Sequence, residues 1–440
     1  MYKRQPYFQR QRVEIYHTYA KSLVEIGLAY PCFCTEEELD KVRAKQEEDK
    51  VLTGYYGEYA TCRNLSYEEI EANIKAGKPY VLRLRSQGSP DKEITFVDAI
   101  KGEIKLPENI HDIVLLKKDG IPTYHFAHAI DDHLMRTTTV VRGGEWLASA
   151  PIHYELFHLL GFKMPAYAHT AHLMKFDEET GGKRKLSKRK DPELSLDYYR
   201  KDGYHPYTMK VYLLTLLNSN FEEWHEKFPD KDINEFPFSV EKMNQSGALF
   251  DKDKLHNICK NELSKLSEEE LYDFLYDWAK ENEPENVEKW FGDREKMLQI
   301  LRLYMGVGAK RRRKDLMYAK QIFELISYFF DGESAEEMDE FKLDEDMVSK
   351  ILKSYLAKYD HNDDNSVWFN KLKEIADEHG FASDMKAYKA NPENFKGNVS
   401  DIAEAVRIAV TGRANTPDLW TIVHIMGEEQ MTERIKKHIK

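Results

Sequence analysis

The stretch of sequence that decides the fold is DGIPTYHFAHAIDDHLMRTTTVVRGGEW, residues 119–146. Its order predicts a turn, a short helix that carries Tyr124, a polar corner and a strand that ends at Arg142. Ligands of open α/β sheets bind beyond the carboxyl ends of the strands. An arginine at such an end can grip a carboxylate with a fork of N–H donors, so a carboxylate is the candidate ligand.

The polar residues of this stretch leave alternatives open. From spacing alone, a structural salt bridge explains Arg142 as well as a bound carboxylate does. The corner Asp131-Asp132-His133 could suggest a metal site, but no fourth ligand lies near it in the sequence. A capped turn is therefore the favoured interpretation of that trio.

A second informative segment is GGKRKLSKRKDP, residues 181–192, in which six of the eight residues 183–190 are lysine or arginine. A basic loop of this kind is a natural clamp for a polyphosphate. It is not a Walker A sequence, because Asp177 stands where that motif has its first glycine and no Ser or Thr follows Lys183. A solvated basic loop without a partner is the alternative.

Periodicity predicts alternating helices and strands in the first half of the chain and helices almost throughout beyond about residue 205. N-cap signatures place helix starts at Thr35, Ser66 and Ser267, each with a glutamate three positions later. We expect a helix over 13–30 that Gly27 ends, an alternating strand at 80–85, buried strands of an α/β sheet at 112–116 and 137–142, a helix at 147–161 and a loop at 176–192.

Composition narrows the class of protein. A chain of 440 residues predicts two to four domains, and its 41% hydrophobic and 32% charged residues suit a largely helical protein that does not span a membrane. Four cysteines without even spacing, and no apolar segment behind the first charges, predict a cytoplasmic location. The net charge of -12 does not exclude RNA, because a local basic face is sufficient to bind it.

Taken together, these segments resemble a bacterial-type glutamyl-tRNA synthetase, a class I enzyme. Residues 185–189, KLSKR, match the KMSKS-type signature of that family, and DGIPTYHFA, DDHLM and VVRGGEW match its second catalytic half. The resemblance continues in order through YFQRQRVEIY near the start, AYPCFCTEEEL at 29–39, SGALFDKDKL at 246–255 and VRIAVTGRANTPDLW at 406–420.

The resemblance implies an α/β fold, the second half of a Rossmann-like catalytic domain with an inserted domain, followed by a helical anticodon-binding region. The implied domains are a catalytic remnant at 1–14, the inserted acceptor-binding domain at 15–110, the second catalytic half at 111–192, a stem-contact region at 193–265 and the anticodon-binding domain at 266–440. The implied partners are tRNA-Glu, glutamate and ATP, and we expect a monomer.

The family's functional residues carry over onto matching positions. Tyr124 would contact the glutamate side chain and Arg142 would pair with a glutamate carboxylate. Lys185 and Lys188 would act as clamps on the phosphates in the catalytic step, with Mg²⁺ beside them. His128 is not counted as a ligand, and His172 stands where many relatives have proline. The implied ATP contacts are Glu145, Leu173, Met174, Lys185, Leu186, Ser187, Lys188 and Arg189.

Some parts of the family pattern do not occur in this sequence. The family's catalytic fold opens with a strand, a HIGH-type ATP-binding motif and an EDTD segment, which together with their surroundings make up roughly a hundred residues, half of a doubly wound sheet. We therefore expect the 440-residue chain alone to be inactive. The alternative to a ligase is a tRNA-binding paralogue or fragment without aminoacylation activity.

The resemblance also implies a possible zinc site. Cys32, Cys34 and Cys62 echo a site of some relatives, in which a tyrosine lies four residues before the last cysteine. Here Glu58 occupies that position, so zinc is the less favoured interpretation and three free thiols the more favoured one. The basic run 310–314 is either a solvated helix face or a contact for tRNA phosphates.

Overall fold

The computed structural model describes residues 8–177, 179–187, 189–245, 247–330 and 338–440. These residues form two compact units. The first contains Met1–Lys185 and Thr215–Phe250, and the second contains Leu186–Leu214 and Asp251–Lys440. Each unit is described by itself. No helix among the described residues is both long and apolar enough to cross a membrane.

A four-stranded sheet in the first unit carries Arg142. Its strand order is β4-β3-β7-β6, with β6 parallel to β7 and β3 antiparallel to β4. The prediction of a buried strand at 137–142 is wrong on burial: Val141 is 56% exposed, because β6 lies at the sheet edge. The four strands are β3 (Glu93–Asp98), β4 (Gly102–Pro107), β6 (Thr139–Gly143) and β7 (Ala166–Thr170).

A separate antiparallel sheet has the order β1-β2-β5. The strands predicted at 80–85 and 112–116 are confirmed as its members, but the second does not share a sheet with β6. The alternation predicted for β2 is wrong: Arg83 is buried like its neighbours, because it lies over the Tyr55 ring and donates to the Asp112 carbonyl. The strands are β1 (Ala29–Cys32), β2 (Val81–Leu84) and β5 (Val114–Leu116).

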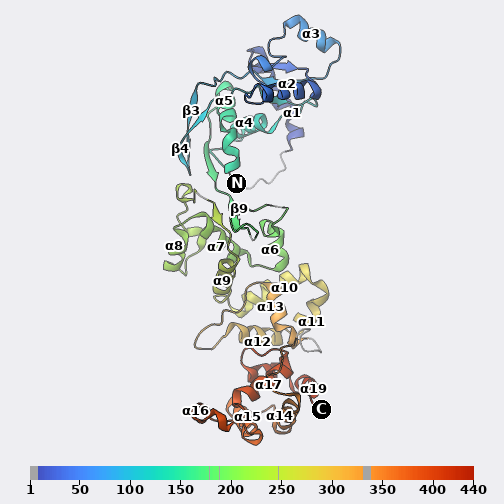
Figure 1. Ribbon diagram of the computed structural model, residues 1–440, viewed down its shortest axis with the longest axis vertical. Coiled ribbons are helices and arrows are strands. Elements are labelled where there is room, and N and C mark those ends of the chain that lie inside the picture. Colours follow the sequence, from blue (N-terminus) through green and yellow to red (C-terminus); the bar gives the residue numbers. More distant parts are fainter. Residues whose placement is uncertain (1–7, 178, 188, 246, 331–337) are drawn as a thin grey trace. The chain divides into compact units, whose positions relative to one another are not determined.

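Helices α1 to α5 accompany the first two sheets (Figure 1). The capping boxes predicted at Thr35 and Ser66 are confirmed. The prediction that Gly27 ends the first helix is confirmed: the helix stops at Glu25, and Gly27 adopts a left-handed φ of 75°. The helix predicted at 147–161 is preceded by a 3-10 segment, Gly144–Ser149. The helices are α1 (Val13–Glu25), α2 (Glu36–Glu48), α3 (Tyr67–Lys75), α4 (Tyr124–Leu134) and α5 (Ala150–Leu159).

A third, small sheet has the order β10-β8-β9. It consists of β8 (Leu173–Phe176), β9 (Lys183–Lys185) and β10 (Ala248–Leu249). The predicted loop at 176–192 therefore contains a strand, β9, which pairs antiparallel with β8. This pairing places Lys185 opposite Met174.

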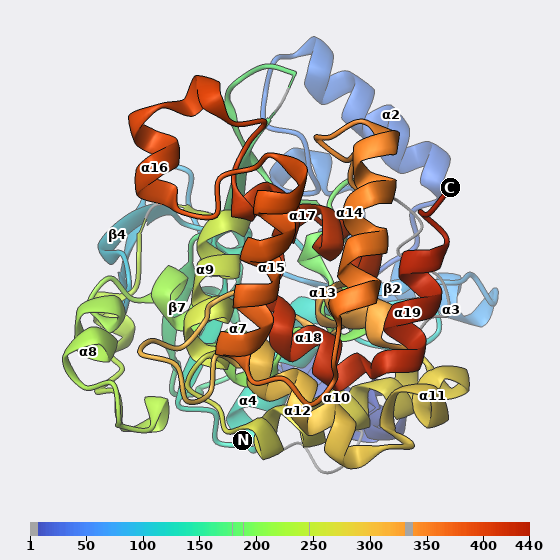
Figure 2. The same cartoon turned by 90° about the horizontal axis from the view of Figure 1, so that it is seen from below.

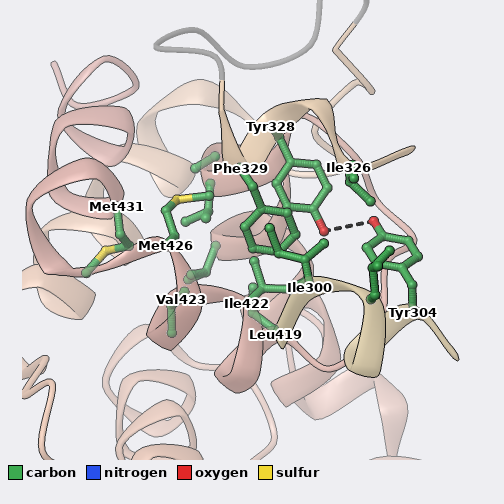
Figure 3. Close-up of a cluster of buried hydrophobic side chains, with 14 of the residues drawn as sticks. Ile300, Tyr304, Ile326, Tyr328, Phe329, Leu419, Ile422, Val423, Met426 and Met431 are labelled. Atoms are coloured by element: carbon green, nitrogen blue, oxygen red, sulfur yellow. Dashed lines mark hydrogen bonds between the residues drawn. The ribbon is translucent and has the colours of Figure 1, made fainter. Parts of the chain in front are cut away.

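The second unit is built mainly of helices joined by loops, in agreement with the helical periodicity. Its three helices α14, α15 and α17 pack against one another (Figure 2). The capping box at Ser267 is confirmed, and the Tyr304 and Tyr328 hydroxyls meet at 2.9 Å inside the core (Figure 3). With α7 and α8, which lie partly or wholly in the first unit, the remaining helices are α6 (Leu196–Asp202), α7 (Pro206–Leu217), α8 (Phe221–Lys227), α9 (Lys252–Leu263), α10 (Glu268–Asn282), α11 (Val287–Phe291), α12 (Arg294–Met305), α13 (Ala319–Ile326), α14 (Glu345–Lys358), α15 (Asn365–His379), α16 (Met385–Ala390), α17 (Val399–Thr411), α18 (Leu419–Met426) and α19 (Glu428–Lys436).

Candidate active site

Arg142 is the second-to-last residue of β6 and lies opposite His169 of β7. Its Nε donates to His169 Nε2 at 2.9 Å, and its Nη1 lies 3.0 Å from His153 Nδ1. Its Nη2 donates to the Trp146 carbonyl at 3.4 Å, and the guanidinium lies 4.6 Å from the centre of the Tyr167 ring. Arginine remains charged in proteins, so a positive charge is held at the strand end by neutral groups.

No carboxylate forms an ion pair with Arg142 among the residues that the structure describes. This observation disfavours the structural salt bridge as an explanation of Arg142. Burial lowers the pKa of His153 to about 2 and also lowers the pKa of His169, so neither imidazole competes with Arg142 for positive charge. The site therefore has an uncompensated cation that suits an anionic ligand.

Tyr124 is the first residue of α4, and its side chain is half-exposed. Its ring stacks on His128 at 5.7 Å and lies 4.5 Å from the Trp146 ring. Trp146 also offers its carbonyl to Arg142, so the two predicted glutamate contacts share this neighbour. His128 is occupied on both ring nitrogens, by the Tyr167 hydroxyl at 2.8 Å and by Asp132 at 2.7 Å.

The Asp-Asp-His trio is not a corner but the last full turn of α4. Asp131 accepts hydrogen bonds from Arg12 and Tyr16, and the His133 ring stacks on Phe162 at 3.7 Å. These side chains serve packing and ion pairing, in agreement with a structural role, although the capped turn was the wrong local structure.

The predicted ATP contacts lie on the small sheet and the 3-10 segment before α5. Lys185 Nζ lies 3.5 Å from His172 Nε2, which is 3.4 Å from Glu145 Oε2. His172, the departure from the family's proline, thus lies between two of these predicted contacts. Met174 uses its carbonyl to accept the Phe250 amide at 2.7 Å, and Leu173 pairs with Ala248 of β10.

The rest of the KLSKR motif belongs to the second unit. Leu186 is buried, and Ser187 donates its amide to Asp191 Oδ2 at 2.7 Å. Arg189 is exposed. Lys188, the predicted catalytic clamp, lies outside the described residues.

Three thiols gather in the first unit. The Sγ atoms of Cys32, Cys34 and Cys62 all lie within 4.8 Å of one another. They are the one group of possible metal ligands found among the described residues. Tyr55 brings its hydroxyl to 3.3 Å from both Cys32 and Cys34. Tetrahedral zinc with bonds of about 2.3 Å keeps its sulfur ligands about 3.8 Å apart. Three thiols and a phenol oxygen fit such a site.

The sequence places Tyr55, Tyr56 and Tyr59 near Cys62 but leaves the fourth ligand undecided, because none of them lies four residues before that cysteine. Hydrogen bonds from the Cys34 and Cys62 thiols lower the pKa of Cys32, so one sulfur of the cluster readily becomes a thiolate ligand. The fourth cysteine, Cys259, is buried far from this cluster in the sequence, and its thiol lies 3.5 Å from the Thr208 hydroxyl.

The basic run 310–314 lies between α12 and α13 and not on a helix face, which corrects one of its two interpretations. Arg313 pairs with Asp315, and Lys314 donates to Asn261. Lys310, Arg311 and Arg312 are exposed. Arg311 and Arg313 line a cavity of 660 Å³ together with residues of α12 and α18.

Comparisons with known proteins agree with this arrangement. The family described as "tRNA synthetases class I (E and Q), catalytic domain" matches residues 1–257, and the family "Anticodon binding domain" matches residues 270–439. The fold is thus that of a class I aminoacyl-tRNA synthetase.

Individual relatives narrow the class. A glutamate–tRNA ligase of Acetivibrio thermocellus is 53% identical over 434 residues, which cover 98% of this chain and 79% of that protein. One from Clostridium perfringens is 46% identical, with 99% and 79% covered. The crystal structure of a glutamate tRNA ligase from Elizabethkingia meningosepticum in complex with its amino acid is similar with a TM-score of 0.74, at 26% identity, with 99% and 84% covered. The chain belongs to the glutamate–tRNA ligase family.

Proposed function

We propose that this chain serves ATP-dependent ligation of glutamate to tRNA-Glu. A glutamate carboxylate oxygen attacks the α-phosphorus of ATP and pyrophosphate leaves; a hydroxyl at the tRNA 3′ end then attacks the glutamyl carbonyl and AMP leaves. Positioning and electrostatics do most of this work. The observation that carries the proposal is Arg142, a cation without a carboxylate partner among the described residues.

Arg142 would bind a glutamate carboxylate and Tyr124 would offer its exposed hydroxyl to the glutamate side chain. On the phosphate side, Lys185 and Glu145 lie at either side of His172, and we assign Lys185, with Lys188, to the phosphates of ATP. Mg²⁺ bound with ATP supplies further positive charge when pyrophosphate leaves. Leu173, Met174, Leu186, Ser187 and Arg189 complete the proposed ATP contacts.

Glutamate binding tests the proposal without requiring turnover. Calorimetry of the 440-residue chain should detect L-glutamate, and D-glutamate or L-glutamine should bind more weakly. Replacing Arg142 by alanine should remove the signal, while replacing the exposed Arg189 should leave it unchanged. Equal binding of glutamate by the wild type and Arg142→Ala would refute the assignment. Aminoacylation of tRNA-Glu by the chain alone tests the separate prediction that it is inactive.

We also propose a structural zinc ion on Cys32, Cys34 and Cys62, with Tyr55 as the fourth ligand. The support is the mutual distance of the thiols and the phenol between two of them. Purified protein should contain one zinc per chain by mass spectrometry of the metal. Cys34→Ser should lose it, Tyr55→Phe should release it faster to a chelator, and Cys259→Ser should retain it. A metal-free wild type prepared in zinc-supplemented medium would exclude the site.

For tRNA, we propose that the exposed Lys310, Arg311 and Arg312 contact phosphates. Replacing the three by alanine should weaken tRNA-Glu binding and reduce the slope of log affinity against log salt by up to about three. An unchanged slope would leave these residues as solvated surface.

A further inference from the structure

We propose that Asp98, His169 and His153 are positioning residues that hold Arg142 by fixing the tautomers of two imidazoles. This proposal rests on the proposed function, because it concerns how the glutamate-binding cation is oriented. The chain of contacts runs from Asp98 through His169, Arg142 and His153 to His125, and it joins β3, β7, β6, α5 and α4.

The series of contacts begins at the buried carboxylate of Asp98. Asp98 Oδ1 accepts the amides of Ile100 at 3.0 Å and Lys101 at 2.9 Å. Its Oδ2 faces His169, with the amide at 3.0 Å and Nδ1 at 2.6 Å. Burial would raise the pKa of Asp98, but the bonds from His169 and the two amides leave it below its ordinary value. A charged carboxylate therefore requires the His169 proton on Nδ1.

The tautomer of His169 decides what it can do for Arg142. With the proton on Nδ1, its Nε2 carries a lone pair that accepts the Arg142 Nε–H at 2.9 Å. The other tautomer, or the doubly protonated ring, would point an N–H at the N–H of Arg142. His169 is fully buried, so neither state could be relieved by water. Carboxylates orient metal-binding histidines in the same way.

On the other side of Arg142, His153 is the opposite tautomer to His169. Arg142 Nη1 can only donate, so His153 Nδ1, at 3.0 Å, must accept. The His153 proton is therefore on Nε2, which lies 2.9 Å from His125 Nδ1. His153 is fully buried as well. Both imidazoles are neutral acceptors, and they orient the guanidinium without neutralising it.

This arrangement has a consequence for the ligand. Three N–H groups of Arg142 are used by His169, His153 and the Trp146 carbonyl. One N–H remains on each terminal nitrogen, and these two donors are left for a carboxylate. A carboxylate in place of either histidine would neutralise the same fork and compete with the substrate. Neutral acceptors avoid that competition while limiting the rotamers of a flexible side chain.

Asp98→Asn is the sharpest test. The amide oxygen should keep the Oδ1 position, because two backbone N–H groups point there, so the NH₂ group faces His169. His169 must then accept at Nδ1 and carry its proton on Nε2, toward Arg142. We expect glutamate affinity to fall about tenfold or more and ATP affinity to stay unchanged. Losses of this size follow when a carboxylate that orients a metal-binding histidine is replaced. Asp112→Asn, another fully buried carboxylate, is the matched control for lost stability and should leave glutamate affinity unchanged.

Imidazole ¹⁵N shifts of the wild-type chain give a readout that does not depend on glutamate binding. We expect His169 protonated on Nδ1 and His153 on Nε2, both neutral at pH 7, and His169 switched to Nε2 in Asp98→Asn. His169→Gln, whose amide oxygen can accept from Arg142, should bind glutamate within about threefold of the wild type, whereas His169→Leu should not. If Asp98→Asn does not fold, this pair of variants and the wild-type shifts still decide the proposal.

The opposite tautomers, or a charged His169, in the wild type would overturn the positioning role. So would equal glutamate affinity in His169→Leu and His169→Gln. Correct tautomers in a protein that binds no glutamate would instead refute the proposed function and leave the positioning of Arg142 intact.

Discussion

Two buried charge networks in the first unit differ in one respect. Asp112 is fully buried and is paired with Arg63, while Tyr30 donates to it at 2.6 Å and the Ser86 amide at 2.8 Å. Arg142 has two neutral histidines and a carbonyl, and no carboxylate among the described residues. In the first network each charge has a partner of opposite charge, and we call such a network closed. In the second network the cation has no such partner among the described residues, and we call it open. Closed networks of this kind stabilise a fold or fix its geometry, whereas an open cation indicates a ligand site.

Arg63→Ala should have the largest effect on stability. It leaves the Asp112 carboxylate buried without its cation, and breaking such a pair costs about 3–5 kcal/mol in the free energy of unfolding. Urea denaturation measures this loss. At a temperature where the variant is still folded, glutamate affinity should equal that of the wild type. A loss below about 1 kcal/mol would mean that Asp112 is protonated or solvated instead of ion-paired.

Arg142→Ala should show the reverse pattern. Glutamate affinity should fall by at least about 2–3 kcal/mol, since a charged hydrogen-bond partner of the carboxylate is lost. The free energy of unfolding should fall by less than in Arg63→Ala, because the groups left without a partner are the neutral acceptors of His169 and His153 and not a buried anion. Parallel urea denaturation and calorimetry separate the two quantities. If Arg142→Ala were as strongly destabilised as Arg63→Ala, Arg142 would have a structural role and not a ligand-binding one.

The open site should also respond to acid through His153. Its neighbours are Arg142 of β6, His125, His128 and Tyr124 of α4, and Tyr167 and His169 of β7. The pKa of His153 in the folded chain is lowered to about 2 from an ordinary value of 6.5, first by burial and then by its neighbours, His128 and Arg142 foremost. The unfolded chain therefore binds a proton that the folded chain does not, between these two values.

The contribution of neutral His153 to the free energy of unfolding is therefore present in full above pH 6.5. It decreases as the pH falls below 6.5, by up to about 1.4 kcal/mol per pH unit. Unfolding curves at pH 7.0 and 5.5 should show a smaller difference for His153→Asn, whose side-chain oxygen can replace Nδ1 as acceptor. His158→Asn, at an exposed histidine of the same unit, serves as the control. An unchanged pH dependence in His153→Asn would mean that this imidazole is solvated.

Lys185→Ala should have the smallest effect. Lys185 is exposed, so its contribution to ATP affinity is that of a surface cation, about 0.5–1 kcal/mol, or a few-fold in Kd. Fluorescence titration with an ATP analogue measures it, and glutamate affinity should not change. A loss of both affinities would show that β9 and the Arg142 site are one cooperative structure instead of two independent contacts.

Local patterns in the sequence were sufficient for much of the fold. The three capping boxes, the helical second half and the strand carrying Arg142 follow from signals within a few residues of one another. The burial of β6 did not, because it depends on which strand lies at a sheet edge. The predicted domain boundaries stay predictions; β3 and β7 share a sheet although they fall on either side of the boundary at residue 110.

The site was predictable only in part, for the same reason. Tyr124 and Arg142 stand in one motif, but His169 lies 27 residues from Arg142 and Asp98 lies 71 residues from His169. A lone histidine or aspartate in a strand gives no sign of its partner. Tyr55 could not be singled out among the three tyrosines near Cys62, because the expected spacing was four residues and Tyr55 lies seven residues before that cysteine.

The most direct test of the central claim is a crystal structure of the chain with L-glutamate, refined beside a ligand-free crystal of the same form. The account predicts one glutamate carboxylate within hydrogen-bond distance of both terminal nitrogens of Arg142, with His169 and His153 still accepting from the same guanidinium. Glutamate bound away from Arg142, or a protein carboxylate in that position in the ligand-free crystal, would contradict it.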